Sequence, residues 1–304
     1  LVVDLDSTVA EVYGKTKQGA SYGYTGVSGY HPLIATRAGT GEILGSRMRK
    51  GAAGSSRGVL RFIGELLATI GRAGVTGQVT VRADSAFWSW KLIDKLNKAG
   101  VGWSITVRLV TKVTDTIAAI PEENWQTIGY TRGGHAQVAE TSYTTGTGKR
   151  TRTVRLVVRR TRLADTAQAA MWPTWRHHAF ICNNTLTTVE ADRFHRNHAV
   201  VELAIRELKD NGLEHCPSGS FAANGAWLAC AVLAHNLCRW AGIIALDGPI
   251  RTARTIRNRL IALAGVLVNR SGTPTLRLPT DWPWTHQFAS ALTTIRALPN
   301  AASP

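Results

Sequence analysis

The chain has 304 residues, with 36 Lys and Arg against 20 Asp and Glu, and a formal net charge of +16. Hydrophobic residues make up 44% and charged residues 18%. This composition excludes intrinsic disorder, because disordered chains are poor in apolar residues and rich in charge. A folded protein with such a surplus of positive charge is expected to bind a polyanion, with nucleic acid first and an anionic membrane second.

The start of the chain has no basic segment followed by an apolar run and a cleavage site, so no secretory signal is expected. Asn224, His235, Asn236 and Arg239 interrupt the most apolar stretch, 221–246, which favours a buried core helix over a membrane span. The cysteines form no CxxC pair, which argues against a zinc site and a disulfide scaffold. We therefore expect a soluble, cytoplasmic protein with no membrane partner.

Two basic stretches contain no acidic residue. One lies between Glu140 and Asp165, and the other between Asp247 and Asp281. Such stretches neutralise phosphates and release counterions, which makes binding strong at low salt and weak at high salt. The alternative is a solvated basic surface without a specific partner.

Residues 1–109 predict strands and helices in alternation. The first strand is rich in Val and Leu, as a buried strand would be. A turn at 37–41 joins the next two strands as a hairpin, and Ser55 and Ser56 offer an N-cap for a helix. The predicted order is strands 1–6, 30–36 and 42–49, a helix after residue 56, strand 78–83, helix 87–97 and strand 102–109.

The rest of the chain divides into a β-rich and a helical part. Glycine turns and Thr, Val and Arg-rich runs predict strands over 110–182, as an insertion into the first unit. A capping-box pattern at Thr187 predicts a helix that ends near Gly212. Further helices are expected over 221–246, over 252–268 and after Trp284. The expected domains are a first core part (1–109), the insertion (110–182), a core completion (183–246) and a C-terminal helical extension (247–304).

Three acidic residues of this basic chain lie at the ends of predicted strands or within a predicted helix. Asp6 closes the first strand, Asp84 closes the fourth, and Glu202 lies in the middle of the helix that begins near Thr187. Ligands and catalysis gather at the carboxyl ends of adjacent strands in open sheets. A cage of carboxylate oxygens suits Mg²⁺ or Mn²⁺, and two such ions can support phosphodiester chemistry.

Each of these acids also has a plain structural explanation. An aspartate after a strand is commonly a turn or cap residue, and Asp4 competes with Asp6 for the first position. Glu202 could pair with Arg206, since residues four apart on a helix are neighbours.

Three segments carry a resemblance to a known family. They are residues 4–9 (DLDSTV) with 23–24 and 29–33, residues 82–87 (RADSAF), and residues 201–209 (VELAIRELK) with 217–224. In this order they resemble the DDE transposases of bacterial insertion sequences, in the group that carries a β-strand insertion before the catalytic glutamate. The resemblance spans residues 1 to about 245.

The resemblance implies an α/β fold: an RNase H-like (retroviral-integrase-like) mixed sheet flanked by helices, with a β-rich insertion and a C-terminal helical extension. It favours Asp6 over Asp4 and implies that Asp6, Asp84 and Glu202 are catalytic and hold two Mg²⁺ ions, for which Mn²⁺ can substitute. The implied activity is metal-dependent cleavage at transposon ends and strand transfer into target DNA, with a homodimer in a synaptic complex as a possible assembly.

The final helix of the family has the pattern Y-x2-R-x3-E-x6-K. With Glu202 as its glutamate, Lys209 matches the lysine, whereas His198 and His195 stand at the arginine and tyrosine positions. The resemblance assigns DNA contacts to Lys209, Arg206, His198 and His195, and the neighbouring Arg196 could replace the arginine in part. Two histidines and a carboxylate on one helix face also fit zinc, as a weaker alternative.

The insertion and the start of the chain raise further expectations. In relatives an insertion can present an aromatic residue to an unstacked base, and Trp125, Trp172 and Trp175 are candidates by location. Asp6 lies near the first residue, so we expect the chain to lack the N-terminal DNA-recognition domain that relatives carry. Two other functions remain open: a catalytically inactive DNA-binding remnant, and an RNase H-like nuclease without transfer activity.

Overall fold

The computed structural model of the protein describes residues 1–14, 16–130, 134–162 and 175–299. The contacts between residues divide the chain into two compact units. Unit 1 comprises Leu1–Thr8, Leu33–Ala38 and Ala53–Val201, and unit 2 comprises Val9–Pro32, Gly39–Ala52 and Glu202–Pro304. Unit 1 therefore runs across the boundaries expected at residues 109 and 182.

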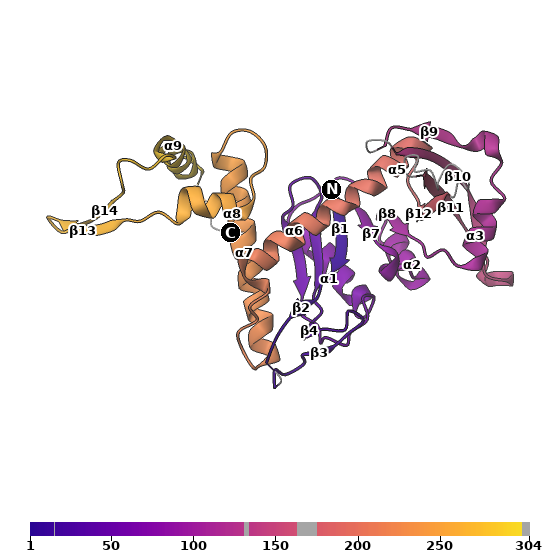
Figure 1. The fold of residues 1–304 in the computed structure, drawn as a ribbon, viewed down its shortest axis with the longest axis horizontal. Helices are drawn as coiled ribbons and strands as arrows, with labels where there is room; N and C mark the ends of the chain where they lie inside the picture. The colour runs from indigo at the N-terminus through magenta and orange to yellow at the C-terminus, as the bar shows by residue number, and fades with distance from the viewer. Residues whose placement is uncertain (15, 131–133, 163–174, 300–304) are drawn as a thin grey trace, which may run out of the picture. The chain divides into compact units, whose positions relative to one another are not determined.

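Unit 1 contains a mixed sheet with the strand order β5-β1-β7-β8-β12-β11-β10-β9 (Figure 1). β1 pairs antiparallel with β5 and parallel with β7, and β7 pairs parallel with β8. The strands are β1 (Val2–Ser7), β5 (Leu33–Arg37), β7 (Thr80–Ala83), β8 (Gly102–Thr106), β9 (Gln126–Ile128), β10 (His135–Thr145), β11 (Arg152–Arg162) and β12 (Arg176–Cys182). The helices are α1 (Val59–Arg72), α2 (Trp90–Lys98), α3 (Thr111–Ala118) and α5 (Thr188–Arg196). The expected α/β class, with a large mixed sheet flanked by helices, is confirmed.

Alternation along β1 sets the two faces of this sheet. Val3 and Leu5 are fully buried, and the residue between them, Asp4, lies on the opposite face. Helix α1 buries apolar side chains at helical spacing and packs on α2, which contacts β8. On the face of Asp4, Arg82 donates to the carbonyl of Phe194 in α5. The α5 helix therefore covers the face on which Asp4 lies.

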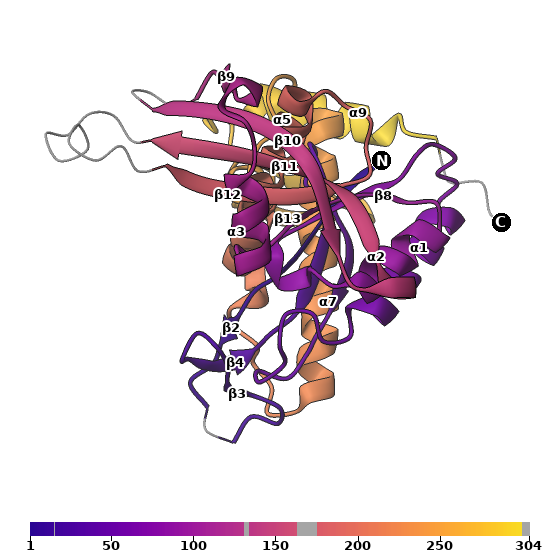
Figure 2. The ribbon, with the colours of Figure 1, turned by 90° about the vertical axis from the view of Figure 1, so that its right-hand side faces the viewer.

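The β-rich insertion prolongs the same sheet. β12 pairs antiparallel with β8, and β11, β10 and β9 follow as antiparallel neighbours. Figure 2 shows β10, β11 and β12 running side by side as long strands. A helix, α3, occupies the beginning of this segment, where the Thr and Val content favoured strands. Helices α3 and α5 both contact β10.

Unit 2 is built around one long helix. Its elements are β2 (Ala10–Glu11), β3 (Ser21–Tyr22), β4 (Ser28–Tyr30), β6 (Ile43–Arg47), α6 (Val201–Leu208), α7 (Phe221–Ala245), α8 (Ala253–Ile256), β13 (Val266–Arg270), β14 (Thr273–Arg277) and α9 (Thr285–Arg296). β2, β4 and β3 form a small antiparallel sheet. The strand expected over 30–36 is divided between β4 and β5, because Pro32 cannot donate a ladder hydrogen bond.

Polar residues on one side of α7 hold the early segments of unit 2. Asn224 donates to the Tyr30 hydroxyl (3.0 Å), and His235 Nε2 lies 3.0 Å from the carbonyl of Gly41. Asn236 accepts from the backbone N–H of Ile43 and donates to its carbonyl. These bonds explain why 9–32 and 39–52 belong to unit 2.

Helix α7 is, among the described residues, the one helix long and apolar enough to cross a membrane by length and composition. Only 33% of its most apolar window is buried. The expected core helix is therefore buried on the side of Asn224 and His235, while Leu233, Leu237 and Trp240 are exposed.

The helix expected over 252–268 forms only as far as Ile261, and the prediction is wrong beyond that residue. Helix α8 continues into a π-helical turn at Arg257–Ile261, and β13 and β14 then form an antiparallel hairpin. The hairpin turn has Ser271 at φ 50° and Gly272 at φ 82°, the positive φ values that a two-residue hairpin turn needs. The expected C-terminal helix forms as α9.

Candidate active site

Asp6 and Asp84 lie side by side at the carboxyl ends of two parallel strands. The register of β1 and β7 pairs Asp4 with Arg82 and Leu5 with Ala83. One step further along both chains brings Asp6 beside Asp84, on strands about 4.8 Å apart. Both aspartates therefore lie at the sheet edge where the sequence predicted a site.

Local hydrogen bonds orient both carboxylates. Asp6 Oδ1 accepts from the backbone N–H of Ser7 (2.6 Å). Asp84 caps the short 3₁₀ turn Ser85–Phe87, accepting from the backbone N–H of Ala86 (3.0 Å). Asp84 is thus a cap residue, as is common for an aspartate that follows a strand, and capping occupies one of its two carboxylate oxygens. Both side chains are half-buried.

Asp4, the alternative to Asp6, is neutralised inside unit 1. Its exposed fraction is 1%, and Arg82 donates to it through Nε (2.7 Å to Oδ1) and Nη2 (2.8 Å to Oδ2). The His198 Nδ1 lies 2.9 Å from Asp4 Oδ1. A carboxylate enclosed by these partners holds the sheet and the α5 segment together. This geometry favours Asp6 as the first carboxylate of the site.

Glu202 is the first residue of the last segment of unit 2, and its side chain is exposed on α6. The predicted triad therefore draws on both units. In the part of the chain that the structure describes, no ion pair joins Glu202 to Arg206. Nor do the described residues contain any group of three or more His, Cys, Asp or Glu side chains able to hold a metal ion.

The helical run that carries Glu202 is not a uniform α-helix. Thr187 and Glu190 form the expected capping box at the start of α5. A 3₁₀ turn, Asn197–Val200, then separates α5 from α6. Because a 3₁₀ turn has three residues rather than 3.6, it changes the angular phase of the side chains that follow. The run from His195 to Glu202 is therefore not one regular α-helix, as the spacing argument had assumed.

His195 is a core residue. Its Nδ1 lies 2.8 Å from Ser104 Oγ and its Nε2 lies 2.9 Å from Thr106 Oγ1, while its ring stacks on Phe180 at 4.1 Å. Burial, followed by the neighbouring His178, lowers the pKa of His195 well below its ordinary value. The expected phosphate contact by His195 is corrected accordingly: the ring is buried and both nitrogens are engaged. The same engagement leaves no nitrogen for zinc.

His198 and Arg196 also have partners inside unit 1. His198 faces Asp4, as described above, with 13% of its side chain exposed. Arg196 Nε lies 2.8 Å from Asp192 Oδ2, and its guanidinium lies 5.8 Å from the Tyr130 ring centre. Because both side chains already have acidic partners, neither is free to contact a DNA phosphate. Arg206 is exposed, and Lys209, in the π-helical turn Lys209–Leu213, is half-buried.

A buried polar cluster, which the sequence reasoning missed, lies under the insertion strands. Asp192 is fully buried and accepts from Arg159 Nη1 at 2.7 Å. Burial, then the Arg159 charge, lowers the pKa of the nearby His178 to about 4. The signal in the sequence is a charged residue that follows an apolar run, such as Arg159 after Leu156–Val158 in β11.

The insertion tryptophans hold an arginine. The Arg160 guanidinium lies 4.2 Å from the Trp125 ring centre and 4.5 Å from that of Trp175, and it pairs with Glu122. Trp125 is buried. The third candidate, Trp172, lies outside the described residues.

The donor chemistry of the neighbouring aspartates fits a hard divalent cation, because Mg²⁺ and Mn²⁺ prefer carboxylate oxygens. Asp6 and Asp84 place two such carboxylates next to each other at one edge of the sheet.

Comparison with known proteins gives one family and one structural likeness. A sequence model of the family "Transposase DDE domain group 1" matches residues 1–300. No curated protein matches the chain. A cryo-EM structure of the piggyBac transposase synaptic complex with hairpin DNA is similar over 84% of this chain, with 11% identity and a TM-score of 0.49. The match covers 51% of that protein's chain, so this chain spans about half its length.

Proposed function

The chain belongs to the transposase DDE domain group 1 family, and on this premise we propose that it is an active transposase. It would cleave DNA at transposon ends and transfer the cut strand into target DNA, with Asp6, Asp84 and Glu202 as catalytic residues. Family membership supports the DNA substrate, as does the net charge of +16.

The register that sets Asp6 beside Asp84 is the observation that carries this proposal. The family name implies two aspartates and a glutamate, and two neighbouring strand ends supply the aspartates. The buried Asp4–Arg82 pair fixes the mutual position of these strands two residues before the site. Such support keeps the two carboxylates at a constant separation, as a preorganised site requires.

DDE transposases use divalent metal ions, and we propose that Asp6, Asp84 and Glu202 hold two Mg²⁺ ions, for which Mn²⁺ can substitute. When bound, such ions activate water or a 3′-hydroxyl and stabilise the leaving oxygen. The Ser7 and Ala86 backbone N–H groups orient the two aspartates. Arg206 and Lys209 would bind backbone phosphates, which positions DNA without reading its sequence.

The proposal extends to the setting of the reaction. We propose that the chain derives from a bacterial insertion sequence and acts in the cytoplasm on nucleoid DNA. We also propose a homodimer, because joining two transposon ends in one synaptic complex requires two active sites.

A second candidate is an inactive DNA-binding remnant. The observation in its favour is the state of His195 and His198, which replace the tyrosine and arginine of the family pattern. His195 is buried between Ser104 and Thr106, and His198 faces Asp4. Neither histidine is therefore available to contact a terminal phosphate, so other residues would have to bind the transposon end.

A plasmid-nicking assay separates the two candidates. Supercoiled DNA is incubated with Mg²⁺ or Mn²⁺ and with wild type or the Asp6→Asn, Asp84→Asn and Glu202→Gln variants. An active transposase nicks the plasmid, and each variant loses the activity. Asp115→Asn is the matched control, because Asp115 is an exposed acid on α3, and it should nick like wild type. Salt-sensitive DNA binding without nicking by wild type would favour the remnant.

A further inference from the structure

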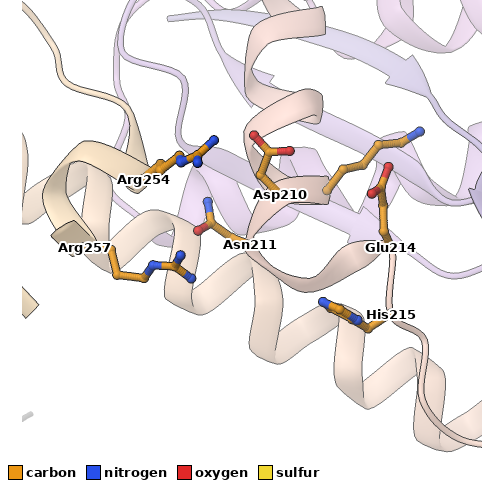
Figure 3. A pocket seen from close by; sticks show the side chains of 7 residues that line it. Asp210, Asn211, Glu214, His215, Arg254 and Arg257 are labelled. Atoms are coloured by element: carbon orange, nitrogen blue, oxygen red, sulfur yellow. The ribbon is translucent and has the colours of Figure 1, made fainter. Parts of the chain in front are cut away.

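Unit 2 contains a polar cavity of about 290 Å³ between the π-helical turn Lys209–Leu213 and helix α8 (Figure 3). Its cationic lining consists of Lys209, Arg254 and Arg257. Asp210, Asn211, Glu214 and His215 complete the wall. All of these residues belong to unit 2, and the basic α8 segment had no role in the site described above.

A carboxylate ties α8 to the helix that carries Lys209. Glu207 Oε2 accepts from Arg239 Nη2 (2.8 Å) and from the backbone N–H of Ala253 (3.1 Å), the first residue of α8. Arg239 also donates to the carbonyl of Arg251 at 3.3 Å. Glu207 and Arg239 are 12% and 8% exposed, so this clamp is largely shielded from water. It fixes the start of α8 beside the Lys209 turn.

The two arginines of the cavity differ from the buried arginines of the fold. Arg82, Arg159 and Arg239 each pair with a carboxylate. In the described ranges of the chain, no carboxylate pairs with Arg254 or Arg257, and both are exposed. Figure 3 shows them with Asn211 on one side of the cavity and Asp210 and Glu214 on the other.

The chemistry of this side fits the DNA backbone. A guanidinium presents a planar fork of donors that matches phosphate oxygens. Arg254 and Arg257 are three residues apart on one helical segment, where Cβ atoms lie about 5–6 Å apart, so both can reach one phosphate or two adjacent ones. Because Asp210 and Glu214 offset two of the three cations, an isolated small anion gains little, whereas a polyanion contacts several cations at once.

We propose that Arg254 and Arg257 bind the phosphate backbone of DNA next to Lys209, so that α8 forms part of the DNA-binding surface. This inference rests on the proposed function, because it assigns further DNA contacts to the same protein. The contacts position DNA and carry no sequence information.

The salt dependence of DNA binding tests the proposal. Binding of a duplex of arbitrary sequence is measured in EDTA between 50 and 300 mM salt, for wild type and for Arg254→Ala/Arg257→Ala. Loss of two phosphate contacts should reduce the slope of log K against log salt by about 2, at about 0.9 for each contact. The control is Arg61→Ala/Arg72→Ala on α1, which removes the same charge and should keep the wild-type slope.

Two results would overturn the proposal, and they differ. If wild type binds DNA with a salt-dependent affinity and the α8 variant keeps its slope, the inference alone fails. If wild type shows no salt-dependent binding, the proposed function fails with it. Unfolding curves of the α8 variant should match those of wild type, because both arginines are exposed and without ion pairs in the described structure.

Discussion

Asp4 and Arg82 form a buried bidentate ion pair across the parallel strands β1 and β7. Two residues further along each strand are Asp6 and Asp84, on the same face of the sheet. The ion pair neutralises the first acid of the DLD segment, and the second acid lies at the sheet edge, where it accepts from the backbone N–H of Ser7. The pair thus explains how two aspartates so close in sequence take different roles.

Replacement of Asp4 should therefore lower the stability of the protein, whereas replacement of Asp6 should abolish its nicking activity. Asp4→Asn leaves the buried Arg82 without its anion, and breaking a buried pair costs about 3–5 kcal/mol. Asp6→Asn should change the free energy of unfolding by less than about 1 kcal/mol and abolish nicking. Urea unfolding and the nicking assay, applied to both variants, check this. Equal destabilisation by the two substitutions would contradict the assignment.

His195 should act through stability rather than through DNA. His195→Ala leaves the Ser104 and Thr106 hydroxyls without their partner and removes the stacking on Phe180. The expected cost is about 2–4 kcal/mol in the free energy of unfolding. The salt slope of DNA binding should stay at the wild-type value below the unfolding transition. A lower slope with unchanged stability would instead support the sequence-based prediction that His195 contacts a phosphate.

Acid should weaken unit 1 before the carboxylates titrate. The pKa of His178 is lowered by burial to about 4, against an ordinary value of 6.5, and that of His195 is lowered in the same direction. Between these values the unfolded chain binds a proton that the folded chain does not, so stability is full above about pH 6.5 and falls toward pH 4. His178 alone should account for about 2 kcal/mol between pH 7.5 and 5.0.

Urea unfolding at these two pH values measures the effect. His178→Gln, which cannot titrate, should lose less stability on acidification than wild type. The same loss in both proteins would mean that His178 does not carry the effect.

Gly212 should be required at the end of the α6 segment. Its φ of 135° lies in the region that side chains avoid, and such strain costs about 1–3 kcal/mol. Gly212→Ala should lower the urea midpoint. Gly225→Ala within α7 is the matched control, because its new Cβ would meet Met48 at an ordinary 3.8 Å. The control should be neutral or stabilising by up to about 1 kcal/mol, since alanine favours helix. A neutral Gly212→Ala would show that the turn relaxes.

The order of strands and helices in the first third of the chain was readable because burial follows local periodicity there. Val3 and Leu5 alternate with polar residues, and apolar residues of α1 recur at helical spacing. Capping chemistry was equally local, as at Thr187 and Glu190. The two aspartates follow from strand ends, which are also local features.

Features set by distant contacts were not readable. The burial of His195 depends on Ser104, Thr106 and Phe180, which are distant from it in the sequence. Apolar residues from Ile261 to Val268 suited a helix, and only the dipeptide Ser271-Gly272 indicated a hairpin. The role of Asp4 depends on Arg82, 78 residues away. Such contacts can be predicted only when the pairing of the strands is known.

The central claim is that Asp6, Asp84 and Glu202 hold one metal site. Cleavage of the protein backbone by Fe²⁺ bound in place of Mg²⁺, with ascorbate and peroxide, tests it most directly, because cuts fall only near the iron. Mass spectrometry should find cuts near all three residues, suppressed by excess Mg²⁺ and absent in Asp6→Asn. Cuts near Asp6 and Asp84 with none near Glu202 would contradict the claim.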